Sequence, residues 1–396
     1  LCYWKEFAPV TQDSKSPMFD FSSAIDRRRQ ASQKWQRYEQ QEVIPMWVAD
    51  MDIAAPPCVQ TTLRRVVDHG VLGYGEASAQ LEQAFIGWCQ RQYQWTPNAE
   101  WLVWLPGVVP GLNLAVEAWL SGEQGLAVQA PVYPPILNVG AMRAQPQQTL
   151  KFSPPEQAQA WSLQTTQLAT ALEANTQALV LCNPQNPLGR VYTRAELTEI
   201  ADAAVAQDLL VISDEIWADL ILQPDTPHLP FAAVNAEAAQ RSVTLMAASK
   251  AFNIAGLTCA VAVIPNADLR ASFVQQMRGL IPSPSYLGLL ASQAAWEDGD
   301  HWLAELKAHL NDNLDLIEAW VSQHPVVQWR RPQATFVAWL DVQMLGLSDP
   351  VQRFLEAGVA LSDGAAFGQS GYVRLNFGCP RAQLEAALHR MSMVCR

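Results

Sequence analysis

Four residues with chemically useful side chains, Tyr133, Asn186, Asp214 and Lys250, each follow closely on a short apolar run. Such runs, alternating with helical patterns from about residue 100 to 265, predict an α/β domain built around a mostly parallel sheet. In an open parallel sheet, ligands bind at the carboxyl ends of the strands. We therefore expect the four side chains to meet in one site. The strands predicted before them are 126–129, 178–182, 209–213 and 243–246.

Lys250 and Asp214 suggest what this site does. Lys250 follows the small residues Ala247-Ala248-Ser249, and a lysine held at such a place can lose its proton and attack a carbonyl. Asp214 ends a buried strand, where a carboxylate needs a cationic partner such as a protonated pyridine nitrogen. The alternatives are a solvated lysine at a strand end and an Asp that caps a helix or pairs with an arginine.

Three further segments carry polar groups suited to a ligand. The segment 183–189 contains two prolines and a glycine, which predict a rigid turn that aims Asn186 inward. Residues 106–111 precede a predicted helix at 111–120, and free amides at a helix start bind phosphate. Arg374 lies in an apolar predicted strand and suits a substrate carboxylate, unless it forms a structural ion pair.

Together these residues resemble the class I/II aminotransferase superfamily of fold-type I pyridoxal-phosphate enzymes, from about residue 18 to the C-terminus. Within it, the chain is most similar to the cystathionine β-lyase branch, the MalY/PatB-type C–S lyases. The resemblance rests on these motifs: Pro45-Met46-Trp47-Val48-Ala49-Asp50-Met51-Asp52, Gly73-Tyr74-Gly75, Ser249-Lys250-Ala251-Phe252-Asn253-Ile254 and Asn376-Phe377-Gly378-Cys379-Pro380.

The resemblance implies pyridoxal 5′-phosphate as the cofactor, bound as a Schiff base on Lys250. Asp214 is then expected to face the pyridine nitrogen and Asn186 the 3′-oxygen, while Tyr133 stacks on the ring. The implied catalytic residues are Lys250, Asp214 and Tyr133.

The resemblance also implies the remaining binding residues. The amides of Val108 and Val109 and the hydroxyl of Ser249 are expected to bind the phosphate. Tyr74 is expected to reach the phosphate of a partner subunit, so that the active unit is a homodimer with shared sites. Arg374, Trp217 and Tyr74 are the expected substrate-binding residues. The chain departs from the family where it has Trp217 in place of a frequent His, and Ala247 in place of a second phosphate-binding Ser.

The expected fold is a large domain with a mostly parallel seven-stranded sheet flanked by helices, together with a smaller α+β domain. The large domain is expected over 46–290. The small domain is expected to combine 18–45 with 291–396, which holds a long predicted helix at 302–323, strands at 335–340 and 372–376 and a last helix at 381–391. Residues 1–17 precede the family-like stretch and are expected to be dispensable.

Composition limits the possible partners. The net charge of −12, from 26 Lys+Arg against 38 Asp+Glu, argues against general binding to nucleic acid or anionic membranes. No apolar run approaches the roughly 20 residues of a membrane span. The seven cysteines are odd in number and lack CxxC spacing, so neither a disulfide framework nor a metal site is indicated. The expected location is the cytoplasm.

Three functions fit these observations. The first is a β-lyase that converts L-cystathionine or a cysteine S-conjugate to a thiol, pyruvate and ammonia. The second is an aminotransferase with the same cofactor, since both reactions begin with removal of the Cα proton by Lys250. The third is a non-catalytic regulator with this fold, which loss of Lys250 or Asp214 would favour. Both residues are present, and the branch resemblance favours the lyase.

Overall fold

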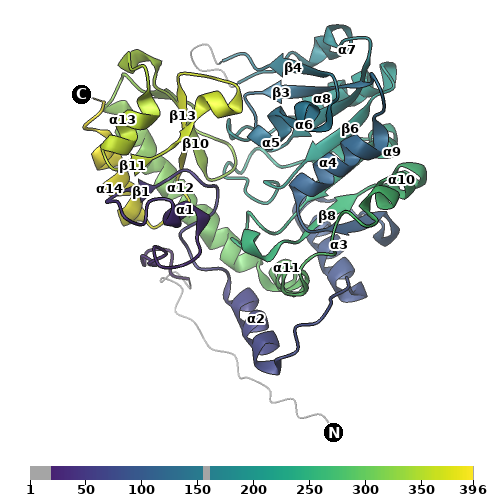
Figure 1. Ribbon diagram of the computed structural model, residues 1–396, viewed down its shortest axis with the longest axis horizontal. Coiled ribbons are helices and arrows are strands. Elements are labelled where there is room, and N and C mark those ends of the chain that lie inside the picture. The colour runs from purple at the N-terminus through teal and green to yellow at the C-terminus, as the bar shows by residue number, and fades with distance from the viewer. Residues whose placement is uncertain (1–18, 155–160, 396) are drawn as a thin grey trace.

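A computed structural model of the chain describes residues 19–154 and 161–395. The segment 1–17, expected to be dispensable, lies outside the described residues. A seven-stranded sheet with helices on both faces fills one side of the molecule, and a smaller sheet with its own helices fills the other (Figure 1).

The large sheet has the strand order β2-β8-β7-β6-β5-β3-β4, and β8 is its antiparallel member. This confirms the mostly parallel seven-stranded sheet. The strands β2 and β4 are not predicted from the sequence; β4 lacks an apolar run because it is polar and half-exposed. The strands are β2 (Leu102–Leu105), β3 (Gly125–Ala130), β4 (Gln147–Lys151), β5 (Thr176–Cys182), β6 (Leu210–Asp214), β7 (Ser242–Met246) and β8 (Ala260–Val263).

The central strands are apolar on both faces because helices cover both faces. In β5, Val180 belongs to the core on one face, whereas Leu179 and Leu181 belong to the core on the other. The first face is covered by α4 (Val108–Trp119), α6 (Val139–Arg143) and α10 (Ala267–Met277), and the second by α7 (Leu168–Ala171) and α8 (Arg194–Ala206). The short helices α5 (Pro134–Leu137) and α9 (Ala236–Gln240) follow β3 and precede β7.

The helices α8 and α4 begin differently, the first with a side-chain cap and the second without one. Thr193 and Glu196 form a reciprocal capping box at the start of α8, so this boundary follows from local sequence. The helix α4 begins at Val108, three residues before the predicted start, and has no side-chain cap. Val108 and Val109 therefore lie in its first turn, where amide groups lack partners within the helix.

The smaller sheet has the order β12-β13-β10-β9 and is antiparallel. The expected long helix is α12, and the last expected helix, α14, has the predicted bounds. The elements of this part are α12 (Asp300–Ser322), β9 (Gln328–Trp329), β10 (Val337–Asp341), α13 (Pro350–Glu356), β11 (Val359–Ala360), β12 (Ser362–Asp363), β13 (Tyr372–Asn376) and α14 (Arg381–Met391).

The N-terminal described residues pack against this smaller part. The strand β1 (Ile44–Pro45) pairs in parallel with β11, and Phe21 contacts Trp302 edge-on at 5.6 Å between ring centroids. These contacts support the division that we propose, with a large domain at 46–290 and a small domain at 18–45 and 291–396. The proposed boundary falls within α11 (Tyr286–Asp298), which packs on α2 (Pro57–His69) and α3 (Ala79–Tyr93).

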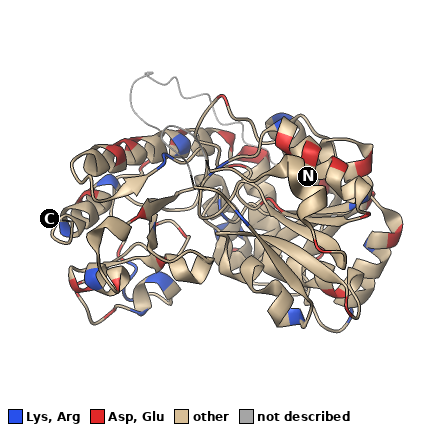
Figure 2. Cartoon of the chain, turned by 90° about the horizontal axis from the view of Figure 1, so that it is seen from above, with Lys and Arg blue, Asp and Glu red and all other residues tan. Residues whose placement is uncertain are grey.

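Many of the charged residues lie on the outer helices (Figure 2), and the chain has more acidic residues than basic ones. Within the described part of the chain, no helix combines the length and the apolar character required to cross a bilayer.

Candidate active site

A cavity of about 1320 Å³ lies between the carboxyl ends of the large-sheet strands and the smaller part. The structure brings nine of the ten expected site residues to its wall. Tyr74 does not line it and is fully exposed in the single chain. The nine are Val108, Val109, Tyr133, Asn186, Asp214, Trp217, Ser249, Lys250 and Arg374.

Strand register explains why these residues meet. Cys182 at the end of β5 is level with Asp214 at the end of β6, and Asp214 is level with Leu245 in β7. The chain segments that follow β5 and β7 therefore leave the sheet on either side of Asp214. They carry Asn186 and Lys250, respectively. The convergence expected from the sequence is thus produced by parallel, in-register strands.

Lys250 has the environment of an amine that can act at neutral pH. Its Nζ donates a 2.7 Å hydrogen bond to the carbonyl of Ala49 and lies 5.5 Å from the ring centroid of Trp217. Burial, followed by the nearby positive charge of Arg374, lowers the pKa of Lys250 to about 8. A measurable fraction of this lysine is therefore a neutral amine at pH 7, ready to attack a carbonyl or accept a proton.

Asp214 is buried, and burial raises its pKa to about 6. Its Oδ1 accepts a 3.1 Å hydrogen bond from the amide of Ile216, which opposes that rise. A buried carboxylate with one amide donor would be stabilised by a cationic ligand in the cavity. Tyr133 stands nearby, and burial together with the charge of Asp214 raises the pKa of its phenol.

Arg374 and Asn186 form a buried pair. The Nη1 of Arg374 donates to Oδ1 of Asn186 at 3.0 Å, so the Asn186 amide nitrogen remains as a donor for a ligand. The guanidinium also donates to the carbonyl of Trp47 at 2.8 Å and to Oγ of Ser362 at 3.4 Å, and it lies 4.7 Å from the ring of Phe367. Burial lowers the pKa of Arg374 to about 10, which still leaves it charged.

The partners of Arg374 are neutral, so the alternative of a structural ion pair does not describe it. A guanidinium has five N–H donors, and three hydrogen bonds are formed here. Its buried Nε has no partner among the described residues. A cation in this state has both the charge and the spare donors to bind a carboxylate.

The first turn of α4 and Ser249 also line the cavity. Gly107 precedes the helix without a side-chain cap, which leaves the first-turn amides facing outward from the helix end. The twelve-residue helix adds its dipole to these amides. Amides and a nearby hydroxyl are suitable donors for a phosphate group.

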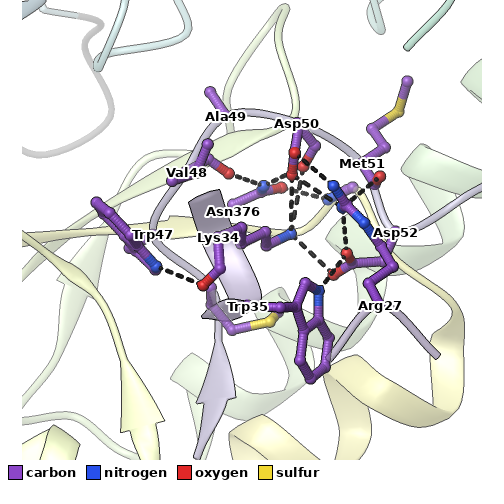
Figure 3. Close-up of polar contacts among 12 residues, drawn as sticks. Arg27, Lys34, Trp35, Trp47, Val48, Ala49, Asp50, Met51, Asp52 and Asn376 are labelled. Carbon is purple, nitrogen blue, oxygen red and sulfur yellow. Dashed lines mark hydrogen bonds and ion pairs between the residues drawn. The ribbon is translucent and has the colours of Figure 1, made fainter. Parts of the chain in front are cut away.

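Several residues at this site were not predicted as functional from the sequence. The carbonyls of Trp47 and Ala49 contact Arg374 and Lys250, respectively. These two residues lie in the motif 45–52, which the sequence resemblance included without a role. Asp52, the last residue of this motif, forms a buried ion pair with Lys34 (Figure 3). Lys34 is 0% exposed, and nothing in the polar sequence around it signals burial.

The similarity of the chain to known proteins identifies its family. Residues 42–391 match the family model for aminotransferase class I and II, so the chain belongs to this family. It has the α/β fold-type I architecture expected from the sequence.

The chain is also similar to individual proteins over nearly its full length. It is 34% identical to the cystathionine β-lyase PatB of Bacillus subtilis, over 94% of this chain and 98% of that protein. It is 40% identical to OvoB, with a TM-score of 0.91, over 95% of this chain and 99% of that structure. It is 26% identical to cystalysin from Treponema denticola, whose crystal structure contains pyridoxal 5′-phosphate, with a TM-score of 0.90 and coverage of 95% and 98%.

Proposed function

We propose that this protein is a pyridoxal-phosphate-dependent carbon–sulfur β-lyase that acts on L-cystathionine or a related cysteine S-conjugate. The observation that carries the proposal is the cavity lined by Lys250, by buried Asp214 and by Arg374, whose guanidinium retains N–H donors without a partner in the described chain. The similarity to a cystathionine β-lyase over nearly the whole chain favours elimination over transamination.

The residues of the cavity fit a phosphorylated pyridine aldehyde. The helix start at Val108 and the hydroxyl of Ser249 suit its phosphate, and Asp214 suits its ring nitrogen. Asn186 keeps an amide donor for the ring oxygen because Arg374 occupies its Oδ1. Lys250 supplies the amine that condenses with the aldehyde. The group supplies an electron sink for negative charge at the substrate Cα when it is bound.

The protein residues then have distinct roles in the reaction. Arg374 binds the substrate carboxylate and sets the position of Cα. Once the substrate amino group has displaced it from the aldehyde, Lys250 would be a free amine able to accept the Cα proton, and its lowered pKa favours the neutral form. The Cβ–S bond breaks as a thiolate leaves, and the remaining fragment is hydrolysed to pyruvate and ammonia. The carboxylate of Asp214 favours a protonated ring nitrogen throughout.

In this proposal, the wall of the cavity sets the direction of the substrate's Cβ–S bond. Trp217 is buried, and its ring packs edge-on against Phe336 with 4.8 Å between centroids. This contact holds the Trp217 ring at the cavity wall. We therefore assign Trp217 to the orientation of the sulfur substituent, which departs from the histidine frequent in the family.

The active unit in this proposal is a homodimer in which Tyr74 reaches the phosphate of the partner subunit. The support is that Tyr74 is 110% exposed and follows an exposed apolar stretch at the end of α2, which projects from the body of the molecule (Figure 1). Exposed apolar patches mark association surfaces. This stretch comprises Val67, Val71 and Leu72. We also propose a cytoplasmic location, which suits the free thiols of the six described cysteines.

Product analysis with L-cystathionine tests the function. Without a keto acid, the lyase gives many turnovers and releases homocysteine, pyruvate and ammonia in equal amounts. Lys250→Ala serves as the control and gives no turnover. A single turnover that stalls, and resumes only when a keto acid is added, would instead establish an aminotransferase.

A further inference from the structure

One short segment of the chain, residues 47–53, contacts both principal cations of the site. The carbonyl of Ala49 accepts from Nζ of Lys250 at 2.7 Å. The carbonyl of Trp47, two residues earlier, accepts from Nη2 of Arg374 at 2.8 Å. The segment therefore links the amine proposed to take the proton with the guanidinium proposed to bind the carboxylate.

The chain segments of Lys250 and Arg374 in turn hold residues 47–53. Asn253, three residues after Lys250, accepts from the amide of Met51 at 2.9 Å and donates to the carbonyls of Met51 at 2.9 Å and Ile53 at 2.7 Å. Asn376, two residues after Arg374, donates to the carbonyls of Val48 at 2.5 Å and Asp50 at 2.6 Å. The contacts are thus reciprocal on both sides.

A buried ion cluster anchors the end of the segment (Figure 3). The carboxylate of Asp52 is 1% exposed and lies 2.8 Å from Nζ of Lys34 and 2.7 Å from Nη1 of Arg27. It also accepts from the indole of Trp35 at 2.8 Å and from the amide of Gln383 at 2.7 Å. Burial opposes the charge of Asp52, but the field of Lys34 and these donors hold its pKa below the usual value.

Asp52 and Lys34 themselves stay outside the reaction. Neither side chain lines the cavity, and the hydrogen-bond and ion-pair partners of the two side chains in the described part of the chain belong to residues 27–52 and to Gln383. Buried ion pairs are poor sources of net stability compared with apolar packing. A pair that is contacted by four further side chains, those of Arg27, Trp35, Asp50 and Gln383, does, however, fix one backbone geometry.

We propose that the Lys34–Asp52 ion pair is a positioning element of the active site, which acts through residues 47–53 to set the spacing of Lys250 and Arg374. The inference rests on the proposed roles of Lys250 and Arg374. Its test is the titration of Lys250 in cofactor-free protein, which needs neither turnover nor substrate. A protein without lyase activity can therefore still support the positioning role.

The test measures the pH midpoint at which Lys250 is acetylated, by mass spectrometry of cofactor-free protein. The charged groups that face Lys250 are Arg374, Asp50 and Asp214, and all three remain in the test variant. Asp52→Asn combined with Lys34→Met removes both buried charges together, so no uncompensated charge is left. The wild-type midpoint is expected near pH 8. Because burial is the largest cause of this low value, loosening residues 47–53 is expected to raise the midpoint by about 1 pH unit.

Leu197→Ala is the matched control for lost stability. Leu197 is buried in α8, in the core on the far side of the sheet from α4, and does not line the cavity. Its truncation is expected to lower the Tm but leave the Lys250 midpoint and the Kd for pyridoxal 5′-phosphate unchanged. The double variant is expected to weaken that Kd at least tenfold and to lower kcat/KM similarly.

Trp35→Phe, which removes a single donor to Asp52, provides a milder variant if the double variant does not fold. A smaller upward shift of the midpoint is expected from it. The proposal is overturned if the folded variants lower the Tm as Leu197→Ala does, yet keep the wild-type midpoint and the wild-type Kd for pyridoxal 5′-phosphate.

Discussion

Replacement of Arg374 by lysine separates charge from geometry at the proposed carboxylate site. Lysine keeps the positive charge but cannot reproduce the planar fork that reaches Asn186 Oδ1 and the Trp47 carbonyl together. The Asn186 contact is buried and the Trp47 contact is part-buried, so losing a donor costs about 1–3 kcal/mol for a buried acceptor left without a partner and less for a part-buried one. We therefore expect Arg374→Lys to be damaging although the charge is conserved.

The effect on activity follows from the loss of a desolvated ion pair. Removing one partner of such a pair costs about 2–5 kcal/mol. At about 1.4 kcal/mol for each factor of ten, kcat/KM for L-cystathionine is expected to fall by about 30-fold to about 4,000-fold in Arg374→Ala. Arg374→Lys is expected near the lower end of this range. The assay is thiol release over a range of substrate concentrations.

Two further measurements make this prediction specific. The Kd for pyridoxal 5′-phosphate is expected to stay within a few-fold of the wild type, since Arg374 is assigned to the substrate. Arg190→Lys is the matched control: Arg190 is also buried, pairs with Glu196 at 2.6 Å and stacks 4.5 Å from Tyr192, but lies outside the cavity wall. Near-normal kcat/KM in Arg374→Ala, or equal losses in the two lysine variants, would refute the assignment.

Three shorter predictions follow from the same site. Lys250→Ala is expected to lose the borohydride-reducible link to pyridoxal 5′-phosphate, and a link that survives in mass spectra would move the attachment point elsewhere. In cofactor-free protein, burial lowers the pKa of Lys250 from 10.5 to about 8. The free energy of unfolding is therefore highest above pH 10.5, where Lys250 is neutral in both states, and falls as the pH decreases through 8, where the buried amine takes up a proton. At pH 7, the free energy of unfolding measured with urea is therefore expected to be larger for Lys250→Met than for the wild type, by up to about 3 kcal/mol. This difference is expected to shrink between pH 8 and pH 10. An unchanged difference at pH 10 would exclude burial of the charged amine as the cause. Mixing the Tyr74→Ala and Lys250→Ala proteins is expected to restore part of the activity if Tyr74 acts in the partner's site, and no gain over the separate proteins would count against the shared site.

The predicted site depended on residues whose own type carries information. Burying a charged side chain costs free energy unless a specific partner or ligand compensates it. This applies to a lysine after small residues, to an aspartate at the end of an apolar strand and to an arginine within such a strand. The strands that present them are recognisable because burial on both faces makes them continuously apolar. This is why Lys250, Asp214, Asn186 and Arg374 could be assigned to one site before their positions were known.

The start of α4 and the exposure of Tyr74 show where that reasoning weakens. The helix was predicted from Gly111, because Pro106 and Pro110 obscure its first turn, whereas it begins at Val108. Tyr74 carried a family resemblance but no local signal of its position. In the single chain it projects into solvent, and the role proposed for it requires a second subunit.

The amino-acid sequence by itself determined the class of fold, the presence of the central strands and the side chains proposed for the chemistry, because these depend on local apolar pattern and on side-chain type. Only the tertiary structure decided how Lys250 and Arg374 are held. Their partners are the backbone carbonyls of Ala49 and Trp47, some 200 and 327 residues away in the chain. A carbonyl group is common to every residue, so no sequence pattern marks the ones that matter. The burial of Lys34 against Asp52 likewise arises only when distant segments close around a polar stretch of the chain.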